Sequence, residues 1–136
     1  MYGPAMALTA DDRLALHELA ARYANTIDAR DWDRFETVFT DTCRYELVGF
    51  GRFDAVIDGC SALRAFMEAS TTHPISHHVT NVEVDEGPDA VRMFSKIAGT
   101  LPGGSVGTAD YADRVVHTAA GWRIAERTVT LRRPPR

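Results

Sequence analysis

Apolar positions recur at helical spacing in the first half of the chain and alternate with polar positions in the second half. Within residues 9–29 the apolar side chains return every three or four residues, at Leu16, Leu19, Ala20, Tyr23 and Ile27. This spacing predicts one long helix with a single buried face. Thr9, with Asp12 three residues later, has the arrangement of a capping box and predicts where the helix begins.

Two shorter helices are predicted within residues 31–74. The first starts after Asp31, a suitable N-cap, and its apolar side consists of Trp32, Phe35, Val38 and Phe39. The second starts after Ser61 and stops before Pro74, because proline disfavours helical backbone in the residue that precedes it. Its buried face consists of Leu63, Phe66 and Met67. Short strands are predicted between the two helices, at residues 43–48 and 53–57.

The second half of the chain contains four longer strand-like runs, at residues 77–85, 90–101, 106–118 and 122–131. Short turns that contain glycine separate them, which predicts antiparallel neighbours. The order of elements predicts an α+β fold, in which a curved, mostly antiparallel sheet wraps around the long helix and encloses a cavity. Residues 1–136 are expected to form one domain, with flexible ends at residues 1–8 and 132–136.

Length and charge narrow the class of protein. The chain has 136 residues, enough for one core, and a net charge of -4, which gives no electrostatic reason to bind nucleic acid or an anionic membrane. No apolar run approaches the ~20 residues that span a bilayer, and the first residues lack the pattern of a signal peptide. Cys43 and Cys60 do not make a disulfide framework. We therefore expect a cytoplasmic protein with reduced cysteines.

Asp28 and His77 are the main candidates for catalysis. A carboxylate can orient an imidazole ring and stabilise its cation, while the imidazole moves protons near neutral pH. Strand alternation leaves open which histidine faces the pocket, because His78 shares a face with Val82 and Val84. His78 then points inward unless a β-bulge resets the alternation, so it is kept as the alternative.

No metal or cofactor is expected. His77 and His78 are adjacent on a strand and point to opposite faces, so they cannot chelate one ion together. The other three histidines, His17, His73 and His117, show no constellation and are expected on the surface or in loops.

Other polar residues have both structural and functional interpretations. Tyr23 lies on the apolar stripe, so its buried hydroxyl needs a partner in the core or on a ligand. Asp113 lies in a central strand, where a carboxylate needs pairing or protonation, and pairing with Arg127 on the next strand is the preferred explanation. Glu46 is expected to face solvent. Trp32 is expected in the core or in the cavity wall.

Short motifs along the chain have the order found in one family. They are Arg22-Tyr23 with Asp28, Asp31-Trp32-Asp33, Phe39-Thr40-Asp41, His77-His78-Val79-Thr80-Asn81, Tyr111-Ala112-Asp113 and Gly121-Trp122-Arg123-Ile124. In this order the chain resembles the cone-shaped α+β family named after nuclear transport factor 2 (NTF2), and within it the SnoaL-like branch, which includes polyketide cyclases. The resemblance covers nearly the whole chain. It implies a pocket for a small hydrophobic molecule and a homodimer or higher homo-oligomer, with the dimer formed through the outer face of the sheet.

Two catalytic patterns of this family can be placed on the sequence. The first resembles scytalone dehydratase and hexachlorocyclohexane dehydrochlorinase, in which an Asp–His pair removes a carbon-bound proton. It implies that His77 is the general base, that Asp28 holds it, and that Tyr23 and Arg127 bind the oxygen or leaving group. The lysine of the dehydrochlorinase has no counterpart here. This pattern implies a cofactor-independent lyase or isomerase that acts on a small, hydrophobic, cyclic substrate.

The second pattern resembles ketosteroid isomerase, which enolises its substrate with a carboxylate base. It implies Glu46 as the base, and Tyr23 and Asp113 as the groups that hold the enolate oxygen. Glu46 replaces an aspartate and Leu47 replaces a proline, and an isomerase of this kind needs no His77. A third possibility is a binding or dimerising module without catalysis, such as the small subunit of a ring-hydroxylating dioxygenase. That hypothesis predicts a pocket filled by its own side chains and Asp28 far from either histidine.

Overall fold

The computed structural model describes residues 7–133. The elements in chain order are α1 (Ala10–Asp28), η1 (Trp32–Thr37), β1 (Phe39–Val48), η2 (Gly51–Phe53), β2 (Ala55–Asp58), α2 (Cys60–Ala69), β3 (Ser76–Glu86), β4 (Val91–Thr100), β5 (Val106–Thr118) and β6 (Gly121–Leu131). The predicted flexible ends lie largely outside the described residues. Of their described parts, Leu8 packs against the core and the backbone N–H of Arg132 donates to Thr108.

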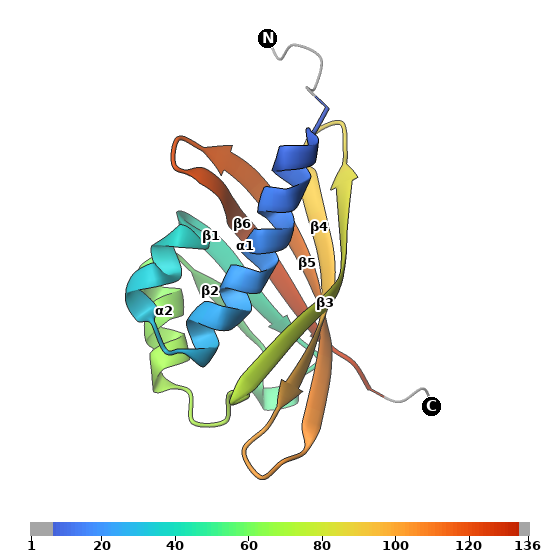
Figure 1. The fold of residues 1–136 in the computed structure, drawn as a ribbon. Coiled ribbons are helices and arrows are strands. Elements are labelled where there is room, and N and C mark those ends of the chain that lie inside the picture. Colours follow the sequence, from blue (N-terminus) through green and yellow to red (C-terminus); the bar gives the residue numbers. More distant parts are fainter. Residues whose placement is uncertain (1–6, 134–136) are drawn as a thin grey trace.

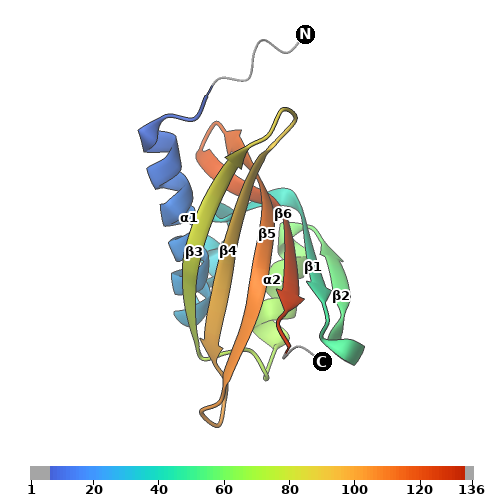
Figure 2. The ribbon, with the colours of Figure 1, turned by 90° about the vertical axis from the view of Figure 1, so that its right-hand side faces the viewer.

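The six strands form one curved sheet in the order β2-β1-β6-β5-β4-β3, which confirms the predicted α+β fold. Neighbouring strands are antiparallel, except that β1 and β6 pair in parallel. The sheet bends around α1, while η1 and α2 lie on the same side, near β1 and β2 (Figure 1). The opposite face carries no helix in the described part of the chain (Figure 2), and a homodimer through this face stays a prediction.

Helix α1 is built as its sequence predicts. The Thr9 hydroxyl accepts a hydrogen bond from the Asp12 N–H at 3.0 Å, and the Asp12 carboxylate accepts one from the Thr9 N–H at 2.9 Å. This reciprocal capping box satisfies two backbone donors that the first turn leaves free, and the cap contributes about 1 kcal/mol. The predicted apolar face is fully buried: Leu16, Leu19, Ala20, Tyr23 and Ile27. None of the described helices is long and apolar enough to cross a bilayer.

Two predicted boundaries are wrong. The second helix stops at Thr37 and Phe39 already belongs to β1, because Phe39 pairs with Ile124 and the Val38 carbonyl accepts the Ile124 N–H at 2.8 Å. Tertiary pairing with β6 therefore overrides the helical spacing of these apolar residues. Helix α2 begins at Cys60 rather than after Ser61, because Gly59 is the N-cap with φ 96°, a backbone conformation that favours glycine.

Candidate active site

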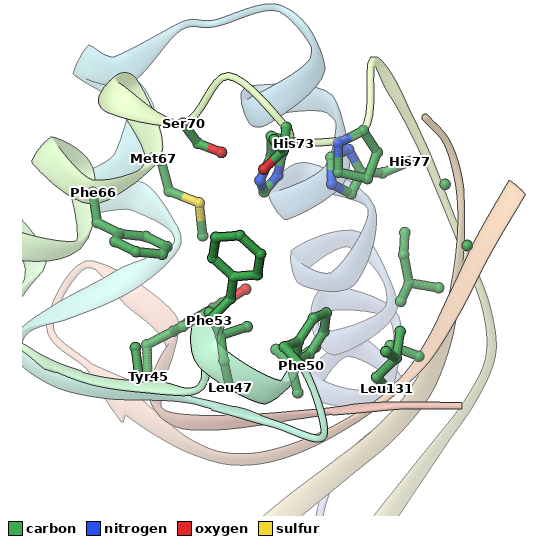
Figure 3. A pocket seen from close by; sticks show the side chains of 18 of the residues that line it. Tyr45, Leu47, Phe50, Phe53, Phe66, Met67, Ser70, His73, His77 and Leu131 are labelled. Carbon is green, nitrogen blue, oxygen red and sulfur yellow. The ribbon is translucent and has the colours of Figure 1, made fainter. Parts of the chain in front are cut away.

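A cavity of about 780 Å³ lies between α1, α2, the loop that follows α2, and the concave face of the sheet. This volume falls within the range of small-molecule sites. Most of its wall is apolar, and Phe50, Phe53, Phe66, Met67 and Leu131 surround the space in Figure 3. The polar groups that line it include Tyr23, Tyr45, Tyr111, His73 and His77. The cavity is thus not filled by its own side chains, contrary to the hypothesis of a module without catalysis.

Asp28 and His77 meet at one wall of this cavity. Asp28 is the last residue of α1, and its Oδ1 lies 2.6 Å from Nδ1 of His77. The same carboxylate accepts the backbone N–H of His77, at 3.1 Å and 2.9 Å to its two oxygens. The Asp28 side chain is 25% exposed and the His77 side chain only 2%. Because Asp28 holds the proton on Nδ1, the lone pair of Nε2 is available to accept a proton.

A β-bulge decides which histidine faces the cavity. The pairing of β3 with β4 shifts between Thr80 and Glu83, and Asn81 has φ 55°. With Thr80 and Asn81 both exposed, His77 faces inward before the bulge, as Val82 and Val84 do after it. The alternative, His78, is exposed, lies near the Ser76 hydroxyl at 3.2 Å, and does not line the cavity.

Burial sets the protonation of His77. Loss of solvent lowers its pKa from the usual value, and the hydrogen bond and charge of Asp28 oppose this effect without cancelling it. The ring is therefore mostly neutral at neutral pH, which is the form that a general base requires.

His73 is a site residue that the sequence did not indicate. Its expected place in a loop is correct, but its ring is not isolated from the other polar groups. It lies in the loop between α2 and β3, lines the cavity, and its ring centroid is 4.7 Å from that of His77 (Figure 3). Burial, and then the charge of His77, lower its pKa to about 4. Periodic spacing cannot relate a loop residue such as His73 to a strand residue such as His77. The one local signal is Pro74, which marks the loop that follows α2.

Arg127 and Asp113 form a buried ion pair beneath the cavity wall. Nε and Nη2 of Arg127 donate to the two Asp113 carboxylate oxygens at 2.7 Å and 2.8 Å, and both side chains are 0% exposed. The guanidinium carbon lies 4.1 Å and 4.0 Å from the ring centroids of Tyr23 and Tyr111. The preferred explanation, pairing of Asp113 with Arg127, is therefore what the structure has. Both residues lie behind the tyrosine rings and do not line the cavity.

Three buried tyrosines, Tyr23, Tyr45 and Tyr111, line the cavity. The hydroxyl oxygens of Tyr23 and Tyr45 are 2.9 Å apart. Burial raises the pKa of Tyr45 and of Tyr111 well above the usual value, so these phenols stay protonated and can donate. The partner that Tyr23 requires is thus a core hydroxyl. Since two hydroxyls share one hydrogen bond, one O–H is left over, and either the Tyr111 hydroxyl or a ligand can accept it.

Glu46 and Trp32 lie away from the cavity. Tyr45 and Leu47 both line the cavity. Glu46 lies between them on β1, so its side chain points to the opposite face of the sheet, away from the cavity. Trp32 packs on Phe35, with ring centroids 5.8 Å apart. Neither residue lines the cavity. Glu46 lies on the outer face of the sheet, as expected, and Trp32 packs against the core, one of the two places expected for it. Residues 7–133 contain no group of three or more histidine, cysteine, aspartate or glutamate side chains that could hold a metal ion.

A curved sheet wrapped around a helix, with an Asp–His pair in an apolar cavity, is the arrangement that the sequence motifs implied. The SnoaL-like domain model matches residues 8–128, so the chain belongs to the SnoaL-like domain family. No match was found among curated proteins.

Solved structures share the whole fold. A protein of unknown function with a cystatin-like fold from Nostoc punctiforme is 23% identical with a TM-score of 0.79, covering 93% of this chain and 96% of that chain. A proposed aromatic ring hydroxylase from Novosphingobium aromaticivorans is 26% identical, with a TM-score of 0.76 and 94% of each chain covered. A proposed scytalone dehydratase from the same organism is 19% identical with a TM-score of 0.72, covering 92% of this chain and 89% of that chain.

Proposed function

We propose that this protein is a cofactor-independent lyase or isomerase that removes a carbon-bound proton from a small, cyclic, hydrophobic substrate. The observation that carries the proposal is the 2.6 Å contact between Asp28 and His77 in the wall of an apolar cavity. A likeness in fold to a proposed scytalone dehydratase agrees with this class, although fold alone does not determine chemistry.

Each polar group has a defined part in the proposed reaction. Nε2 of His77 accepts the proton, and Asp28 keeps the Nδ1 proton in place and stabilises the imidazolium that forms. The free hydroxyl proton of the Tyr23–Tyr45 pair donates to the substrate oxygen on which negative charge develops. The apolar wall excludes water from these groups, which strengthens their electrostatic interactions.

Hydrogen exchange tests the proposal without knowledge of the leaving group. Cyclohexanone, 1-indanone and 1-tetralone are incubated with the protein in D₂O, and loss of the protons next to the carbonyl is followed by NMR. General base catalysis contributes about 10²–10⁴-fold, so we expect exchange of at least one ketone to accelerate on that scale. Ketones that bind in the cavity without any accelerated exchange would contradict the proposed proton removal.

The alternative enolisation by Tyr23, Glu46 and Asp113 makes a different prediction. The structure does not bring these residues together. The Glu46 side chain points away from the cavity, on the other face of the sheet, and Asp113 accepts hydrogen bonds from Arg127. We therefore expect Glu46→Gln to leave the exchange rate within about twofold of the wild type, as for a surface substitution without a role. A collapse of exchange in this variant would restore Glu46 as the base.

A further inference from the structure

The His77 ring has two polar neighbours in the cavity, Tyr23 and His73, and it meets them in different geometries. The Tyr23 ring meets His77 edge-on, with centroids 6.3 Å apart and planes at 81°. The His73 ring lies closer and flatter against His77, with centroids 4.7 Å apart and planes at 37°. The proposed reaction uses the tyrosine hydroxyls and His77, and it leaves His73 without a role.

His73 is a polar side chain without a protein partner. Neither of its ring nitrogens forms a hydrogen bond with a described residue, and Nε2 is completely buried. A buried polar atom left unpaired costs roughly 1–3 kcal/mol, and a phenylalanine ring would fill the same space without that cost. Such a group requires an explanation. A turn of the imidazole about its Cβ–Cγ bond would direct Nε2 toward the cavity that His73 lines, where a ligand can pair with it.

The surroundings keep His73 in place and uncharged. A Cβ atom on Gly99 would lie 2.8 Å from the Pro74 ring, so glycine allows the loop to pack directly on β4. The Ile75 N–H donates to Thr100 at 2.8 Å and pins the other end of the loop to the same strand. Burial, His77 and Arg30 disfavour the charged ring, and Asp28 favours it without reversing the balance. A neutral imidazole offers one donor and one acceptor to a ligand.

We infer that His73 is a second ligand-binding residue, which forms a hydrogen bond with one oxygen of the bound ring while the Tyr23–Tyr45 hydroxyls hold another. Because neither nitrogen is tied to the protein, the imidazole can turn about its Cβ–Cγ bond and present either one to the ligand. The inference rests on the proposed function and narrows its substrate to a ring that carries two oxygen substituents.

Binding of stable aromatic probes tests the inference. Affinities of 1-naphthol and of the dihydroxynaphthalenes with the second hydroxyl at position 2, 3 or 4 are measured by isothermal titration calorimetry. We expect at least one diol to bind about fivefold more tightly than 1-naphthol to the wild type, the gain typical of one hydrogen bond. In His73→Phe the diol should bind less than about twofold more tightly than 1-naphthol.

Two further variants make the result specific. His73→Gln keeps a donor near the position of Nε2 and should retain most of the gain. His78→Phe alters the neighbouring exposed histidine and should behave as the wild type. If the phenylalanine variant does not fold, His73→Leu takes its place in the same comparison.

The outcomes separate the inference from the proposed function. A gain that survives in His73→Phe, or no gain for any diol in the wild type, overturns the role of His73 and leaves proton removal by His77 standing. A wild-type protein that binds neither 1-naphthol nor any diol counts against both, because the apolar cavity would then not accept a ring.

Discussion

Replacing His77 by glutamine is expected to slow hydrogen exchange of a bound ketone by about 10²–10⁴-fold while the fold stays intact. Glutamine keeps the size and polarity of the side chain but cannot accept a proton near neutral pH. The backbone N–H of residue 77 also donates to the Asp28 carboxylate, and the substitution leaves this group unchanged. The hydrogen bonds between α1 and β3 are therefore kept. Exchange rates from NMR, together with thermal unfolding, check both parts of this prediction.

The pH dependence gives a second test of the same base. Exchange requires neutral His77, whose pKa lies below its usual value of about 6.5, so the rate should fall as pH drops through that lowered pKa and be level at neutral pH. Asp28 raises the pKa of His77, so Asp28→Asn should move the midpoint to still lower pH and also reduce the plateau. His78→Gln is the matched control and should retain the wild-type profile.

Full activity in His77→Gln would remove this residue from the mechanism.

Arg127→Met is expected to destabilise the protein by about 3–5 kcal/mol, because it leaves the Asp113 carboxylate buried without its cation. The free energy of unfolding of a domain is only about 5–15 kcal/mol, so this single change removes a large share of it. Burial alone would lower the pKa of Arg127, but the charge and hydrogen bonds of Asp113 outweigh it and raise the pKa. Denaturation by urea measures the loss.

The double variant Arg127→Met with Asp113→Leu isolates the cause. With both charges removed, no uncompensated ion remains, so we expect most of the lost stability to return. Recovery should be incomplete, since Arg127 also packs against the rings of Tyr23 and Tyr111. A double variant as unstable as Arg127→Met would mean that packing, rather than the unpaired charge, carries the effect.

Periodicity was sufficient to predict the parts of the fold in which one face is buried. The apolar stripe of α1 and the four strands at the C-terminal end of the chain occur where the spacing indicates them. The start of β1 was not predictable in this way, because Phe39 has helical spacing from Phe35 and only its pairing with Ile124 on β6 makes it a strand residue. Long-range pairing of this kind leaves no local signal.

In the candidate site, too, some features have a local sequence signal and others depend on long-range contacts. Asp28 and His77 could be proposed together because their chemistry is complementary and each lies at a recognisable place in an element. The orientation of His77 depended on a bulge that inserts one residue near Asn81, and alternation could indicate the conflict without resolving it. His73 depends on a loop whose path is set by the contact of Pro74 with Gly99, 25 residues further along the chain, and no spacing rule describes such a contact.

The position of Asp28 at the end of α1 has an electrostatic consequence for the base that it holds. The peptide dipoles of a helix add up to a partial negative charge at its C-terminus, and the last turn of α1 contains no basic residue to neutralise it. The negative end of the helix therefore favours the cation of the His77 ring, against the charges of Arg127 and Arg30, which disfavour it. When the imidazole takes up a proton, the C-terminal turn of α1 contributes to its stabilisation in addition to the carboxylate.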